Sequence, residues 1–108
     1  MTFPTNVPAV TVWEKDISAR APTWIRHELG AACWQDTRGQ TDGRESDDHV
    51  FVALHESCVT YLPKKDDRIL LGSVVQSTPP QGALTVAQVK DFRTLGADFM
   101  RHVEMTAK

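Results

Sequence analysis

Apolar and polar residues alternate with a period of two in several parts of the chain, which predicts a fold built from β-strands. The pattern is clearest at 49–55, where Val50, Val52 and Leu54 share one parity. Residues 101–108 repeat it, because Val103 and Met105 alternate with polar side chains. We therefore expect a strand in each segment, and we expect the last one to pair into a sheet through its apolar face.

Other segments carry weaker strand signals between clear breaks. Residues 10–13 predict a short strand, and 15–21 a connection. The stretch 23–34 predicts one long, bent strand in which Gly30 marks a bulge. Further elements are a strand at 58–62, a turn at 63–67, an apolar run at 68–75 and, at 83–92, either a strand or a short helix.

Short strands separated by turn signals favour a small β-barrel or sandwich with at most one or two short helices. The length of 108 residues fits one domain, residues 1–108, with one core. Apolar residues make up 41% and charged residues 24% of the chain, which is typical of globular proteins.

A long polar segment interrupts this pattern at 36–48, where no large apolar residue occurs. Such a segment cannot help to bury a core, so we expect an exposed loop. Loops of this length are uncommon in compact domains unless they are functional or disordered. Its charged residues are our candidate interface: Asp36, Arg38, Asp42, Arg44, Glu45, Asp47 and Asp48.

Charge and segment composition exclude several classes of function. The formal net charge of -2 provides no general positive field for a phosphate backbone, so nucleic acid is not expected as the main ligand. No apolar run reaches the ~20 residues that a membrane-spanning helix needs. We expect synthesis in the cytoplasm, where Cys33 and Cys58 stay reduced and behave as buried small hydrophobic residues.

The ionisable residues do not form a recognisable catalytic or metal-binding motif. His49, His55 and Cys58 are the closest group of zinc-type ligands, but they lack the paired spacing of structural zinc sites. The His27-Glu28 and His55-Glu56 pairs lack the second histidine of a metalloprotease helix. The acidic pairs 47–48 and 66–67 fit solvated turns. We therefore assign no catalytic residue, no metal ligand and no cofactor.

The large aromatic residues are expected mostly in the core. They are Trp13, Trp34, Phe51, Phe92 and Phe99. Trp24 is flanked by polar residues, where a tryptophan can instead anchor a protein interface. We therefore take Trp24 as the candidate interface aromatic.

Two parts of the sequence resemble a family of short bacteriophage proteins, the head-tail connector or minor capsid proteins. The first is Ala32-Cys-Trp-Gln35, followed by a polar spacer and the segment His49-Val-Phe-Val-Ala-Leu54. The second is Val89-Lys-Asp-Phe-Arg-Thr-Leu-Gly96 with Met100-Arg-His-Val-Glu-Met-Thr-Ala-Lys108. Val103 stands where the family usually has tryptophan, and Ala107 where it usually has glycine.

The resemblance implies a head-closure, or stopper, protein, which is a small β-barrel that forms a homo-oligomeric ring in the virion neck. Its partners would be the portal and adaptor proteins and the tail proteins, with passive contact to DNA in the channel. A tail terminator or another neck subunit is an alternative within this class. From another class, a prophage-encoded module that binds a metal or a small ligand stays open.

Overall fold

The computed structural model describes residues 3–18, 20–21, 23–36, 49–94 and 101–108, and its fold is mostly β. The strands are β1 (Val10–Asp16), β2 (Thr23–Leu29), β3 (Cys33–Asp36), β4 (Val50–His55), β5 (Arg68–Leu71), β6 (Leu84–Asp91) and β7 (His102–Ala107). One 3-10 helix, η1 (Glu56–Cys58), is the helical element of the described residues.

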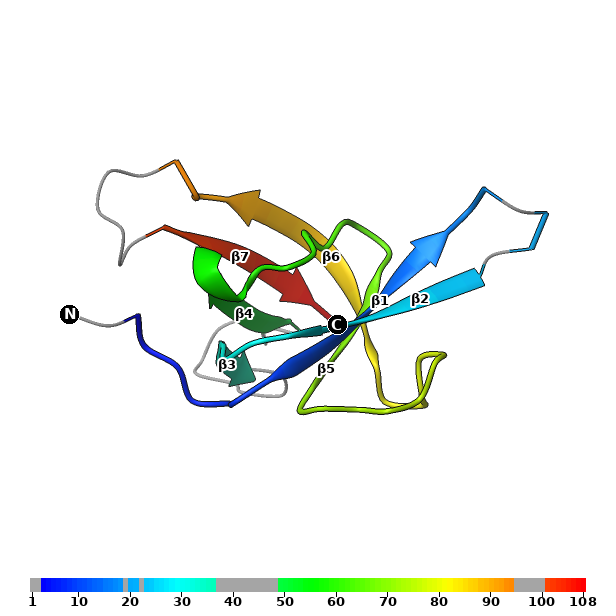
Figure 1. The fold of residues 1–108 in the computed structure, drawn as a ribbon, viewed down its shortest axis with the longest axis horizontal. Helices are drawn as coiled ribbons and strands as arrows, with labels where there is room; N and C mark the ends of the chain where they lie inside the picture. The colour runs from blue at the N-terminus through cyan, green and yellow to red at the C-terminus, as the bar shows by residue number, and fades with distance from the viewer. Residues whose placement is uncertain (1–2, 19, 22, 37–48, 95–100) are drawn as a thin grey trace, which may run out of the picture.

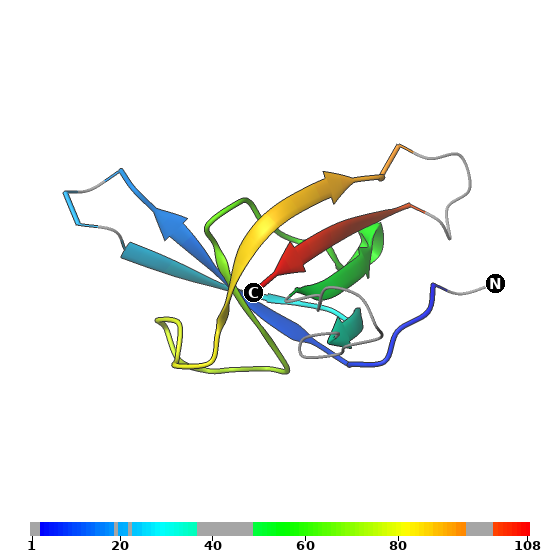
Figure 2. The same ribbon diagram turned by 180° about the vertical axis from the view of Figure 1, so that it is seen from behind.

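All strand pairs are antiparallel, and the strand order is β2-β1-β5-β6-β7-β4-β3. The β1–β2 hairpin extends to one side of the molecule, and the end of β6 points to the other side in both views (Figures 1 and 2). The molecule measures 43 × 37 × 22 Å. The predicted small β fold is therefore confirmed.

A long hairpin closes the sheet on itself. β1 and β2 pair from Asp16 with Thr23 to Val10 with Leu29, and a bridge between Val7 and Ala32 continues the same register. Beyond the bridge, β3 leaves β1 and pairs with β4. The strands at the two ends of the sheet order are thus consecutive parts of one chain segment, which gives a barrel-like shape.

The predicted single strand at 23–34 is therefore divided into β2 and β3. Gly30, at the division, permits a close approach of η1 and does not form the expected bulge. A Cβ atom built on Gly30 would lie 2.7 Å from Cys58 Sγ. The Gly30 N–H group also donates a hydrogen bond of 3.4 Å to the Cys58 carbonyl oxygen.

Apolar side chains at alternate positions of the strands form the core. In β7, Val103, Met105 and Ala107 are buried while the intervening side chains are partly exposed, so the predicted C-terminal strand is confirmed. β4 places Val50, Val52 and Leu54 in the same core, as expected. Burial of these apolar side chains is the main stabilising contribution to such a fold.

Residues 84–91 form the strand β6. An irregularity in its pairing explains why the sequence was compatible with either a strand or a short helix. The pairing with β7 shifts by one residue between Val86 and Gln88. Val86 and Val89 therefore both face inward although their positions differ in parity. A sequence read with a constant period of two cannot place both residues on one face.

Two sequence predictions, for 58–62 and for the start of the connection at residue 15, are wrong, and the apolar run at 68–75 is a strand only in its first half. Residues 58–62 form no strand, because η1 ends at Cys58 and an irregular segment follows. The strand within 68–75 ends at Leu71, and Gly72 adopts a φ of +90°. β1 continues to Asp16, so the connection predicted from residue 15 begins later.

Candidate interaction surfaces

The outer edge of β2 is open within the described part of the chain. Gly72 N–H donates to the Ala9 oxygen, in the register that β5 makes with β1. The even-numbered residues of β1 therefore direct their backbone groups toward β2. It follows that Trp24, Arg26 and Glu28 direct their backbone N–H and C=O groups away from β1. Such an edge is a template for pairing with another strand.

The segment that follows β5, residues 72–76, crosses the face of β1 that points away from the core. Trp13 Nε1 donates a hydrogen bond of 2.9 Å to the Gln76 oxygen. Thr11 Oγ1 donates to the Gly72 oxygen at 2.8 Å and accepts from Val74 N–H at 2.9 Å. These bonds cover Trp13 and Thr11, which are both 0% exposed.

The 72–76 segment also holds the charged side chains of β2. Arg26 Nε donates to the Val74 oxygen, and Ser73 Oγ donates to Glu28 Oε1. The hydrogen bond from Ser73, together with those from Arg26, lowers the pKa of Glu28. Val75 lies between these anchored residues with 86% of its surface exposed. The 72–76 segment therefore supports one face of the β2 edge, and the exposed apolar side chain of Val75 lies next to this edge.

A polar cluster ties the irregular segment after η1 to the opposite face of the hairpin. Its centre is Asp67, whose side chain is 0% exposed. Asp67 accepts hydrogen bonds from Tyr61 Oη at 2.6 Å, Lys64 N–H at 3.0 Å and Lys15 N–H at 3.1 Å. Asp67 thus joins three parts of the chain, and the sequence interpretation of 66–67 as a solvated turn is wrong for this residue.

The rest of the cluster consists of a ring stack and two charged groups. The His27 ring stacks on Tyr61 with centroids 3.9 Å apart, and His27 Nε2 lies 3.0 Å from Glu14 Oε1. Lys64 Nζ lies 3.5 Å from Glu14 Oε2 and 3.3 Å from Asp67 Oδ1. Burial, followed by the hydrogen bond to Asp67, raises the pKa of Tyr61 well above its ordinary range. The cluster therefore favours a neutral phenol that acts as a hydrogen-bond donor.

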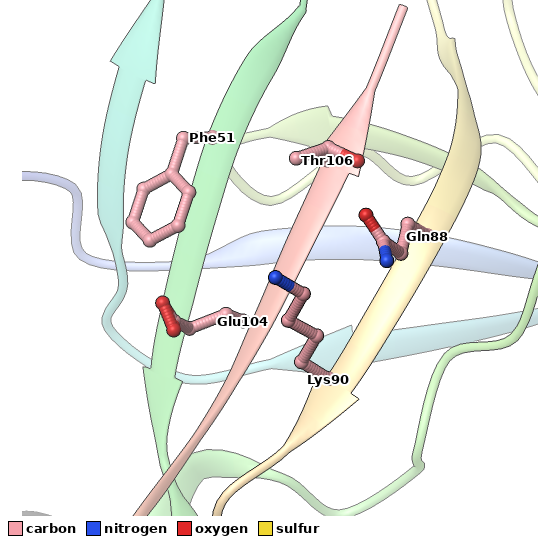
Figure 3. Close-up of a pocket in the computed structure, with 5 residues that line it drawn as sticks. All are labelled: Phe51, Gln88, Lys90, Glu104 and Thr106. Carbon is pink, nitrogen blue, oxygen red and sulfur yellow. The ribbon is translucent and has the colours of Figure 1, made fainter.

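A small hollow lies on the outer face of β4, β7 and β6 (Figure 3). It encloses about 60 Å³ and is lined by Phe51, Gln88, Lys90, Glu104 and Thr106. Sites for drug-sized ligands are usually ~300 Å³ or more and mostly apolar. The volume of this hollow is instead suited to water or a single small polar group.

The sequence-predicted interface residues are only partly within the described structure. Trp24 lies on the open edge, is half-buried, and its ring faces the Arg68 guanidinium at 5.4 Å. Asp36 is exposed at the end of β3. Residues 37–48, which include the other charged residues of the candidate loop, and Phe99 lie outside the described residues. Of the loop candidates, Asp36 alone can be placed relative to Trp24, and the two residues belong to different strands, β3 and β2.

The remaining sequence candidates are distributed over the sheet. Among the residues that the structure describes, no group of three His, Cys, Asp or Glu side chains is arranged to hold a metal ion. Cys33 and Cys58 are free thiols and only partly buried, so their predicted full burial is wrong. Of the predicted core aromatics, Trp13 and Trp34 are buried, whereas Phe51 and Phe92 are partly exposed.

Sequence reasoning missed the residues that organise the hairpin, namely Glu14, His27, Tyr61 and Asp67. They are separated along the chain and meet only when β1, β2 and the segment before β5 come together.

Comparison of the chain with family models, curated proteins and solved structures found no match. No helix in the described residues is long and apolar enough to span a membrane.

Proposed function

We propose that this chain is a structural subunit that forms a head-closure ring in the neck of a tailed bacteriophage. The ring would lie between the portal and adaptor proteins and the tail. The observation that carries the proposal is a barrel-like apolar core from which the β1–β2 hairpin extends, with the outer edge of β2 open within the described residues. Such a unit offers its backbone hydrogen-bonding groups to neighbouring subunits.

The placement of the resembling segments supports this proposal. They contribute β3, β4, β7 and the last residues of β6, and these strands are adjacent in the sheet order β6-β7-β4-β3. The two parts of the sequence that resemble the phage family therefore form one continuous region of the fold. Within this region β4 and β7 are direct neighbours, with Leu54 paired to Val103. A region assembled from distant segments is consistent with a shared fold.

The rigid support of the hairpin also fits an assembly role. Hydrogen bonds that Thr11 and Trp13 donate to the 72–76 segment hold one face of the hairpin, and the Asp67 cluster holds the other. A pre-organised edge loses little conformational entropy when a neighbour binds. Subunit contacts on such an edge therefore need fewer compensating interactions than contacts on an unsupported loop.

Native mass spectrometry tests the proposal. The chain is measured alone and after mixing with any portal, adaptor and tail proteins that the neighbouring genes encode. We expect a closed oligomer of the chain, either alone or on the portal and adaptor complex. A chain that remains monomeric at high concentration and binds none of these proteins contradicts the proposal. Binding to an isolated tail but not to portal complexes would instead favour a tail terminator.

A further inference from the structure

A second open edge belongs to β6. Phe92 N–H donates to the His102 oxygen, which continues the register between β6 and β7. In that register Gln88 and Lys90 direct their backbone groups toward β7. Val89 and Asp91 therefore direct theirs away from it. β5 pairs with β6 only at Thr85 and Leu84, so within the described residues no strand covers this half of β6.

We propose that the β2 edge of one copy pairs with the β6 edge of the next copy, antiparallel, with Arg26 opposite Asp91. This inference rests on the proposed function and names the contact between subunits. Backbone direction allows the pairing, because Arg26 and Glu28 expose their groups on β2, and Asp91 and Val89 expose theirs on β6. Arg26 with Asp91, and Glu28 with Val89, would then each form a residue pair that exchanges two backbone hydrogen bonds.

Side-chain chemistry selects this register. Opposing residues lie on the same face of a sheet, so the Arg26 guanidinium meets the Asp91 carboxylate. On the other face, Ile25, which is 44% exposed, lies opposite the partly exposed Phe92. A shift by two residues in one direction would instead place Glu28 opposite Asp91, and two carboxylates directly opposite each other destabilise a strand pair.

The local ion pairs extend this complementarity. Arg26 already contacts Glu28 at 3.0 Å, and Asp91 contacts Arg93 at 2.7 Å. The hydrogen bonds from Arg93 also keep the pKa of Asp91 low, so this carboxylate is charged at neutral pH. Pairing would bring the two ion pairs together as a group of alternating charges, which is more favourable than two isolated surface pairs.

The two edges also have the geometry of a ring contact. They belong to different strands and lie toward opposite ends of the longest axis in both views (Figures 1 and 2). A contact between two different surfaces is heterologous, and repeated heterologous contacts form a closed ring when the rotation between subunits closes. A contact of β2 with β2 would instead stop at a dimer.

Disulfide cross-linking between copies tests the pairing. Ile25 and Phe92 would form a non-hydrogen-bonded pair with a Cα separation of about 4.5 Å, which suits a disulfide. Single variants I25C and F92C are prepared with Cys33→Ala and Cys58→Ala, mixed, assembled under the conditions that give rings, and oxidised. We expect covalent dimers only in the mixture, and a ladder of covalent oligomers from the double variant.

A matched control uses Ile17→Cys, which is more exposed than Ile25 and belongs to the same hairpin. Mixed I17C and F92C subunits should give no covalent dimer. Cross-linking of I25C with itself alone would overturn the proposal in favour of a two-fold contact. Rings that form normally but never cross-link at I25C and F92C would overturn the proposed edge and leave the ring function intact. The absence of rings with all partners would overturn both.

Discussion

Replacement of Asp67 by asparagine is the sharpest test of what holds the hairpin in place. The carboxylate is fully buried and receives donors on both oxygens. Oδ1 accepts from Lys15 N–H, and Oδ2 accepts from Tyr61 Oη and Lys64 N–H. In either orientation, the amide nitrogen of asparagine would face at least one of these donors, which would then lose its acceptor.

The cost follows from these contacts. A buried donor left without a partner costs about 1–3 kcal/mol, and hydrogen bonds to a charged acceptor are about 1 kcal/mol stronger than those to a neutral one. We therefore expect Asp67→Asn to lower the free energy of unfolding by about 3 kcal/mol. This is a large part of the ~5–15 kcal/mol typical of small domains.

The neighbouring residue provides a control with the same change in charge. Asp66 is exposed and has a φ of +77°, a conformation that asparagine also adopts readily. Asp66→Asn should change stability by no more than about 0.5 kcal/mol. Both variants are measured by denaturant unfolding, followed by tryptophan fluorescence. Similar midpoints for the two variants would refute the role assigned to the buried carboxylate.

Three further predictions concern single positions. Gly30→Ala should cost about 1–3 kcal/mol because of its contact with Cys58, and Cys58→Ala should recover part of this loss; strict additivity in the double-mutant cycle contradicts the contact. Val103→Asp should lower stability by roughly 2 kcal/mol or more in chemical denaturation, whereas Thr106→Asp on the outer face should matter much less; equal effects would be evidence against the assigned faces. Because the pKa of Tyr61 is raised, its contribution to stability is present below about pH 10 and is lost at higher pH. As the chain has one tyrosine, an absorbance titration should show tyrosinate only upon unfolding, and reversible ionisation near pH 10 in the folded protein would contradict this.

The alternation of apolar and polar residues predicts β4 and β7, which pair with each other without a register shift. β7 alternates without interruption, and β4 has Val50, Val52 and Leu54 on its buried face although Ala53 between them is buried as well. β6 was ambiguous because the shift at Val86 and Gln88 changes the parity of its apolar residues. An irregularity of this kind depends on the partner strand, so a single segment of sequence does not reveal it.

The polar cluster was not predictable, because its residues look like ordinary surface residues in the sequence. Asp67 follows another aspartate in a lysine-rich turn, which favours a solvated position. The sequence predicts a strand at 58–62, but this segment is irregular in the structure, and the Tyr61 ring stacks on His27. Contacts over long sequence separation decide both positions, and local propensity contains no information about them.

The long hairpin shows the same limit for topology. The sequence predicts a bent strand at 23–34, and its two halves do continue one register with the segment around β1. The pattern does not show that β2 has an open edge while β3 pairs with β4. The choice of partner is decided by the closure of the sheet, which involves residues from both ends of the chain.

The position of β7 has a consequence for biosynthesis. β7 pairs with both β4 and β6, yet the ribosome makes it after them. Until β7 emerges, the nascent chain carries two strands with unpaired edges and a core that lacks Val103 and Met105. Such edges are prone to pair with other chains. Completion of the barrel therefore awaits β7, and prematurely terminated chains should aggregate.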